Sequence, residues 1–122
     1  MKLIIAGSRD LDIGTEIIRH YVNKLELVPV EVVCGGATGI DNCGKLFSEK
    51  CGIPVKMFGA EWLKYGRSAG PMRNRQMAEY GDALLLIWSG DSKGSASMLL
   101  EMQKLNKPIY QVIIKEIKWN LV

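Results

Sequence analysis

Five short apolar runs recur along the chain, and a glycine-containing loop and a segment with helical spacing follow each of the first four. The runs lie near residues 2–6, 30–34, 53–58, 83–88 and 108–114. They are predominantly apolar instead of alternating regularly with polar residues, which is typical of strands buried on both faces of a parallel sheet. The alternation of strand and helix therefore predicts an α/β fold, a Rossmann-like doubly wound parallel sheet of about five strands in a three-layer sandwich.

Helices are predicted between these strands, over residues 13–27, 40–51, 71–80 and 95–105, with a helical turn at 61–65 and a loop at 66–70. Pro29 stops the first helix, Gly52 suits the C-terminal cap of the second, and Pro71 suits the first turn of the third. A chain of 122 residues is long enough for one core. We therefore expect residues 1–122 to form a single domain.

Charge and cysteine content exclude several classes of protein. The net charge of +3 is spread along the chain without a dense basic face, which argues against nucleic acid as a partner. The three cysteines, Cys34, Cys43 and Cys51, are odd in number and lack CxxC spacing, so neither a disulfide framework nor a metal site is expected. No signal peptide or membrane-spanning run fits the sequence. We expect a cytoplasmic protein with no membrane partner and no cofactor.

The turn after the second strand holds three glycines within five residues, at Gly35, Gly36 and Gly39. Backbone without side chains can approach a ligand closely, and its N–H groups can converge on an anion at the start of the next helix. Thr38 and Asp41 supply the polar side chains of this turn. The alternative is a tight strand-to-helix turn in which Asp41 caps the helix.

Three further loops follow strands or open helices, and right-handed crossovers place such loops at one edge of the sheet. Arg9, in the loop 7–10, offers a donor fork for phosphate, or else pairs with Asp10. Arg73 and Asn74 are expected in the first turn of the third helix, where a bound anion would offset the unfavourable arginine; the alternative is a solvated arginine.

The loop 89–95 has the composition of a phosphate cradle, although Ser95 can also be read as a helix cap. The candidate ligand-binding residues are Gly7, Ser8, Arg9, Gly35, Gly36, Thr38, Asp41, Arg73, Asn74, Ser89, Gly90, Gly94 and Ser95, and the candidate catalytic residues are Arg73 and Asp41.

Aromatic and methionine side chains each allow two interpretations. Trp62, Tyr65 and Trp88 either stack on a ring of the ligand or belong to the core and its rim. The methionines of the last two helices either form an adaptable apolar face for a homo-oligomer or belong to an ordinary core. These methionines are Met72, Met77, Met98 and Met102. We expect a homo-oligomer.

Four ordered motifs together resemble the SLOG superfamily, most closely its small YspA-like branch of bacterial and phage proteins. The motifs are residues 6–10, 35–41, 70–77 and 89–98, and the resemblance covers about residues 2–113. It implies a Rossmann-like fold that binds nucleotides or nucleotide-derived ligands. The superfamily includes the LOG phosphoribohydrolases, which cleave the N-glycosidic bond of nucleoside monophosphates, and the Smf/DprA proteins, which bind single-stranded DNA.

The resemblance to LOG enzymes extends to some catalytic positions. Arg73 stands nine residues before Asp82, as an arginine does in those enzymes, and residues 94–95 match the Gly-Thr of their PGGxGTxxE loop. Met98 stands where the loop has its catalytic glutamate, and YspA-like proteins usually have Asp-Met where this chain has Ser97 and Met98. The candidate replacements for this glutamate are Asp41, Asp91 and Glu101.

Three functions follow from these observations. The first is binding of a nucleotide-like phosphorylated ligand by a sensor or sequestering module, for example in phage–host conflict. The second is hydrolysis of nucleoside monophosphates with a relocated acid, and the third is binding of single-stranded nucleic acid. The sequence favours the first, with slow hydrolysis or none, because donors for a phosphate are present and the catalytic glutamate is not.

Overall fold

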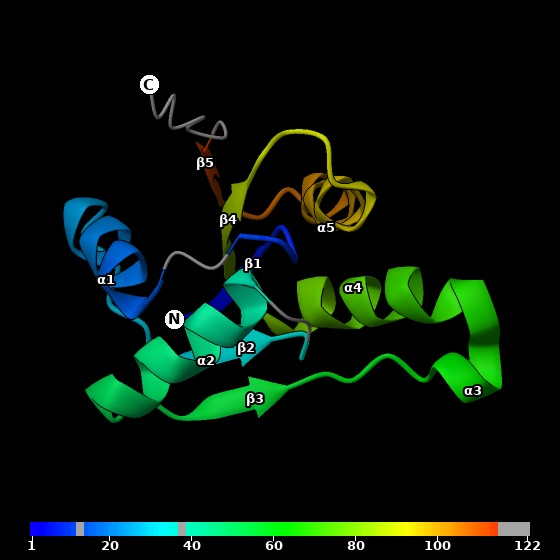
Figure 1. Ribbon diagram of the computed structural model, residues 1–122, viewed down its shortest axis with the longest axis horizontal. Coiled ribbons are helices and arrows are strands. Elements are labelled where there is room, and N and C mark those ends of the chain that lie inside the picture. Colours follow the sequence, from blue (N-terminus) through cyan, green and yellow to red (C-terminus); the bar gives the residue numbers. More distant parts are fainter. Residues whose placement is uncertain (12–13, 37–38, 115–122) are drawn as a thin grey trace, which may run out of the picture.

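The computed structural model describes residues 1–11, 14–36 and 39–114, and it has the predicted alternation of strands and helices (Figure 1). The strands are β1 (Lys2–Gly7), β2 (Glu31–Cys34), β3 (Val55–Met57), β4 (Ala83–Trp88) and β5 (Ile109–Ile113). The helices are α1 (Gly14–Lys24), α2 (Ile40–Cys51), α3 (Trp62–Tyr65), α4 (Ala69–Tyr80) and α5 (Lys93–Lys104), with a 3₁₀ turn η1 (Gly66–Ser68) before α4.

All strand pairs are parallel, and the order across the sheet is β3-β2-β1-β4-β5. The prediction of a Rossmann-like, five-stranded parallel sheet is confirmed. Starting from β1, the strands β2 and β3 are added on one side of it, and β4 and β5 are added on the other side. The order therefore reverses between β1 and β4, and in sheets of this kind the ligand crevice lies outside the carboxyl ends of the strands at that reversal.

The helices form two layers, one on each face of the sheet (Figure 1). On one face, α1 and α2 pack side chains such as Ile18 and Phe47 onto Leu3 and Ile5. On the other face, Met77 of α4 and Met98 of α5 belong to a second core cluster with Ile4 of the sheet. Every residue of β4 is buried, because helices cover both of its faces. This explains why the strand is apolar throughout.

The methionines of α4 and α5 belong to the core. Met77, Met98 and Met102 are each at most 1% exposed and pack against the sheet, while Met72 is half-buried. The interpretation of these side chains as an oligomer face is therefore wrong for three of the four. A homo-oligomer stays a prediction, without support from these residues.

Several element boundaries differ from the predicted ones for local reasons. The strand predicted over 53–58 is shorter because Pro54 has no N–H group and the N–H group of Ile53 donates to the carbonyl oxygen of Ser48. Helix α1 ends at Lys24 because Glu26 has a left-handed φ of 54°. The loop predicted over 66–70 is instead η1 and the first two residues of α4. Ile13, predicted to begin the first helix, lies outside the described residues.

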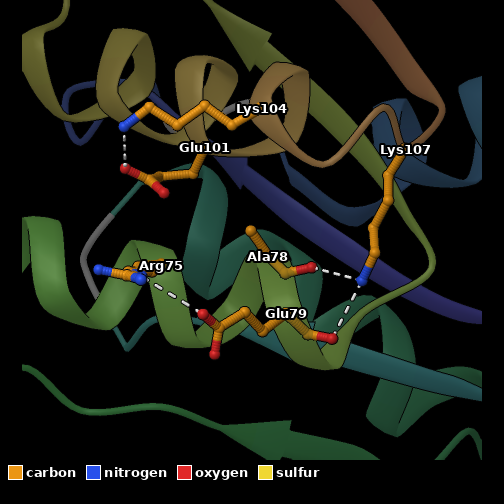
Figure 2. A network of polar contacts seen from close by, with 6 residues as sticks. All are labelled: Arg75, Ala78, Glu79, Glu101, Lys104 and Lys107. Atoms are coloured by element: carbon orange, nitrogen blue, oxygen red, sulfur yellow. Dashed lines mark hydrogen bonds and ion pairs between the residues drawn. The ribbon is translucent and has the colours of Figure 1, made fainter.

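The end of α4 is capped by a side chain from the connection to β5. Lys107 Nζ donates to the carbonyl oxygens of Ala78 and Gly81 at 2.7 Å and of Glu79 at 3.0 Å. Figure 2 shows the bonds to Ala78 and Glu79. Two surface ion pairs lie beside it, Arg75 with Glu79 and Lys104 with Glu101, each at 3.3 Å. A cation at a helix C-terminus satisfies its free carbonyl groups and complements its dipole.

None of the helices that the structure describes has the length and apolar character needed to cross a bilayer.

Candidate functional site

Ser8 joins the three loops that follow β1, β2 and β4. Its carbonyl oxygen accepts the N–H group of Ile40 at 3.3 Å, and its Oγ accepts the N–H group of Ser89 at 3.1 Å. The two hydroxyls of Ser8 and Ser89 lie 3.4 Å apart, and Ser89 Oγ donates to Asp91 Oδ1 at 2.5 Å. Ser8 is fully buried. It holds the three loops together from inside the protein, and it does not line either of the two cavities described below.

The glycines of the turn after β2 are required by close packing. Gly39 has a φ of 70°, and a Cβ atom there would lie 2.4 Å from the carbonyl oxygens of Ser8 and Arg9. A Cβ atom on Gly35 would lie 2.7 Å from Arg73 Nη1 and 2.9 Å from Asp41 Oδ2. The bare backbone thus lets a guanidinium and a carboxylate pack directly against the turn. Thr38 lies outside the described residues.

Arg73 joins this turn to α4. Its Nη1 donates to the carbonyl oxygen of Gly35 at 2.5 Å, and its Nε donates to Asn74 Oδ1 at 3.0 Å. These bonds use two of the five N–H donors of the guanidinium. Because α4 begins at Ala69, Arg73 and Asn74 lie in its second turn, and the prediction that they belong to the first turn is wrong.

Asn74 connects α4 to α5. Its Nδ2 donates to the carbonyl oxygen of Gly94 at 3.3 Å and to Ser97 Oγ at 3.2 Å. With its Oδ1 accepting from Arg73, both ends of the amide are engaged. Asn74 therefore positions Arg73 and the start of α5 relative to each other.

Two of the charged residues at the site are buried. Arg73 is 9% exposed and Asp41 is 5% exposed. Burial lowers the pKa of Arg73 below its ordinary value, the carboxylate of Asp41 acts in the opposite direction, and the cation of Arg9 lowers it further. An arginine remains protonated at neutral pH despite such a shift. The site therefore presents a desolvated cation, and interactions with an anion are stronger there than in water.

Two cavities open at this edge of the sheet. The first has a volume of about 270 Å³ and is lined by Ala6, Gly7, Arg9, Asp41, Arg73, Asn74, Met77, Ser92, Lys93, Gly94, Ser95 and Met98. The second has a volume of about 420 Å³ and is lined by Arg9, Gly35, Gly36, Gly59, Ala60, Trp62 and Arg73. Arg9 and Arg73 line both cavities, which therefore adjoin at these two residues.

The start of α5 forms one wall of the first cavity. Ser92 is the N-cap, and its Oγ accepts the N–H group of Ser95 at 3.3 Å, so the alternative in which Ser95 caps the helix is wrong. Ser95 Oγ is buried and has no hydrogen-bond partner among the residues that the structure describes. A Cβ atom on Gly94 would meet nothing within 4 Å, so this glycine borders open space.

The predicted site residues fall into three groups. The structure brings Gly7, Arg9, Asp41, Arg73, Asn74, Gly94 and Ser95 to the first cavity, and Gly35 and Gly36 to the second. Ser8, Ser89 and Gly90 do not line either cavity; Gly90 has a φ of 97° and turns the chain beside Ile113. The structure adds Ser92 and Lys93, which the sequence analysis does not place among the ligand-binding residues. The signal for them was the pair Ser92 and Ser95, because either serine can cap a helix that begins in this loop.

The three candidate acids are not equivalent. Asp41 lines the first cavity. Asp91 is exposed and accepts a hydrogen bond from Ser89, and Glu101 lies in the groove between α4 and α5 beside Lys104 (Figure 2). Asp41 is therefore the one of the three that is placed to act in the cavity, and Met98 lies in the same wall with 1% of its surface exposed.

Cysteine chemistry and metal chemistry find little support at this edge. Burial and, to a smaller extent, the nearby Asp41 carboxylate raise the pKa of the Cys34 thiol to about 12, so Cys34 stays protonated and is a poor nucleophile at neutral pH. Within the described ranges, no three His, Cys, Asp or Glu side chains are grouped so that they could hold a metal ion.

Comparison with known proteins finds similarity to a phage protein. Over 116 aligned residues the chain is 28% identical to the Gene 61 protein of Mycobacterium phage D29, and the alignment covers 88% of this chain and 93% of that protein. No family model matches the chain, and no solved structure matches it significantly.

Proposed function

We propose that this protein binds a nucleotide or nucleotide-derived phosphorylated ligand, with the phosphate in the first cavity, and that it is a YspA-like member of the SLOG superfamily. Its role would be that of a cytoplasmic sensor or sequestering module. The similarity to a phage protein over nearly the full length of both chains agrees with a role in phage–host conflict.

The observation that carries the proposal is the hydroxyl of Ser95. A buried polar group without a partner costs about 1–3 kcal/mol of folding free energy, so such groups are rare in proteins. Ser95 lines the first cavity and is 3% exposed, and its buried Oγ lacks a partner among the described residues. An oxygen of a bound phosphate would accept its hydrogen and remove this cost.

The rest of the wall favours an anion over an apolar or cationic ligand. Three basic side chains, Arg9, Arg73 and Lys93, line the first cavity against one acid, Asp41. The N-terminus of the 12-residue helix α5 adds its unpaired N–H groups and the positive end of its dipole. Gly94 leaves space for a ligand to approach this helix start closely.

Hydrolysis of nucleoside monophosphates is the second candidate function, and the position of Asp41 favours it. Cleavage of a glycosidic bond uses a carboxylate to activate water or to stabilise the positive charge on the sugar. Met98, at the place of the LOG glutamate, can do neither, whereas Asp41 lines the same cavity. Binding remains our first proposal, because the carboxylate of Asp41 interacts with the buried cation of Arg73, and this pairing favours a structural part for Asp41.

The test is titration calorimetry of AMP, GMP, CMP, UMP and cyclic AMP into the wild type and two serine variants. Ser95→Ala removes the unpartnered hydroxyl, so we expect an unchanged or higher melting temperature and an affinity lower by about tenfold. The matched control is Ser48→Ala, since Ser48 is also buried in a helix but donates to the carbonyl oxygen of Gly44 at 2.8 Å. It should lower stability and leave affinity unchanged. No binding of any of the five nucleotides would overturn the proposal.

A further inference from the structure

The second cavity is lined by an aromatic side chain and by a bare backbone turn. Its volume of about 420 Å³ lies within the range of roughly 300–1,000 Å³ that is usual for ligand pockets. We propose that this cavity holds a planar heteroaromatic ring of the ligand, stacked on the indole of Trp62, while the phosphate of the same ligand lies in the first cavity. This inference rests on the proposed function and narrows its ligand to a nucleotide that carries an aromatic base.

Trp62 is the one of the three predicted stacking residues whose ring is placed for this role. It is 50% exposed and lines the second cavity. Trp88 is 7% exposed, and its Nε1 donates to Gln111 Oε1 at 2.8 Å, so it belongs to the core. Tyr65 is 39% exposed but does not line the cavity. Exposed indole surface next to a polar cavity is available for a ring to cover.

The indole of Trp62 is supported from behind. A Cβ atom on Gly70, in the first turn of α4, would lie 3.2 Å from Cη2 of Trp62, so the far end of the ring rests against the helix backbone. Gly70 is itself buried. The ring is therefore held against α4 at one end while half of the side-chain surface stays open, and a held ring loses little conformational freedom when a ligand stacks on it.

Small residues keep the cavity open in front of the ring. Gly35, Gly36, Gly59 and Ala60 line it, and none of them carries a side chain beyond Cβ. Gly36 has a φ of 78°, a conformation that disfavours any replacement with a side chain. A flat ring could thus lie between the indole and the turn after β2.

Arg9 and Arg73 lie where the two parts of the ligand would meet. Both residues line both cavities, so a molecule that fills the two cavities passes these two residues. Cations at this junction attract the phosphate on one side and the face of an aromatic ring on the other. The ligand expected from this arrangement has an anion at one end, a ring at the other and a short polar linker between them, which describes a nucleoside phosphate better than a sugar phosphate.

The experiment compares nucleoside monophosphates with ribose 5-phosphate, which has the anion and the linker but no ring. We expect the wild type to bind the best of AMP, GMP, CMP and UMP about tenfold more tightly than ribose 5-phosphate, because one stacked base is typically worth that much or more. Trp62→Ala should remove this difference by weakening the nucleotide alone. Trp62→Phe should retain most of the affinity but lose the quenching of indole fluorescence that the nucleotide causes in the wild type.

Tyr65→Ala is the matched control, since it removes an exposed aromatic ring from the same short helix outside the cavity. It should leave both affinities unchanged. Equal affinities of the wild type for the nucleotide and for ribose 5-phosphate would overturn the ring subsite while leaving the anion site intact. Failure of both to bind would overturn the proposed function and this inference together.

Discussion

The guanidinium of Arg73 donates a hydrogen bond from Nη1 to the carbonyl oxygen of Gly35 at 2.5 Å and so joins α4 to the turn after β2. Arg73→Lys keeps the positive charge but cannot hold both Gly35 and Asn74, as the planar fork does. We expect this variant to lose about 1–3 kcal/mol of unfolding free energy in urea denaturation, and to bind AMP about tenfold more weakly by calorimetry.

The control for this prediction is Arg75→Lys on the same helix. The side chain of Arg75 is 73% exposed and pairs with Glu79 across the surface. This variant should match the wild type in both measurements. If Arg73→Lys bound AMP as tightly as the wild type, Arg73 would be a purely structural residue and the phosphate would have to lie elsewhere.

Hydrolysis is expected to be slow or absent. Met98 lines the first cavity, and the resemblance to LOG enzymes would put their catalytic glutamate at this position. Loss of a general acid or base typically lowers a rate by about 10²–10⁴-fold. Incubation of the purified protein with AMP should therefore release little adenine, as measured by liquid chromatography. Rapid release that Asp41→Asn abolishes would contradict this prediction and support the phosphoribohydrolase function.

Lys107 should stabilise the fold more than either ion pair beside it. It donates to three carbonyl oxygens at the end of α4, and Lys107→Met keeps the apolar stem while removing these donors. We expect this variant to lose about 1–2 kcal/mol of unfolding free energy. Arg75→Ala, which breaks an exposed pair, should change it by less than about 0.5 kcal/mol. Equal effects in urea denaturation would show that Lys107 contributes no more than a surface charge.

Stability should fall at alkaline pH because of Cys34. Burial raises the pKa of this thiol from its ordinary value of 9.0 to about 12. As pH rises, the thiol therefore loses its proton in the unfolded chain before it does so in the folded one. The contribution of Cys34 to the free energy of unfolding is complete below pH 9 and is lost progressively between pH 9 and about 12.

We expect the urea midpoint to decrease above pH 9 and Cys34→Ala to make this decrease shallower. The matched variant is Cys51→Ala, which removes an exposed thiol and should leave the pH dependence as it is in the wild type. The prediction fails if the two variants have the same pH profile between pH 8 and pH 11.

The inner strands of the sheet were predictable because they carry their own burial signal, whereas the edge strands β3 and β5 have no fully buried residue. Ala83–Trp88 is apolar at every position and is buried at every position, so no information from elsewhere in the chain was needed. The meeting of the strand-end loops followed from the parallel topology alone.

Side-chain burial at the site was not predictable in the same way. Trp62 and Trp88 have the same residue type, but one lies on an exposed helical turn and the other in the central part of the sheet, and only tertiary packing separates them. Ser92 and Ser95 are both good caps, and the choice depends on where α5 begins. The spacing of the methionines shows that they share a helix face, but it does not show whether that face packs on the sheet or on a second copy of the chain.

The reversal in strand order divides the cleft between two consecutive stretches of chain. Arg9 and Asp41 come from the first half, before the exposed segment 61–68, whereas Arg73, Asn74 and Ser95 come from the second. Neither half alone carries a complete site, since each supplies one of the two arginines that border both cavities. During synthesis the cleft can form only after the start of α5 has emerged from the ribosome. A chain cut within segment 61–68 would bind the ligand only when its two fragments reassociate. Ligand binding would therefore measure the reassociation of the fragments.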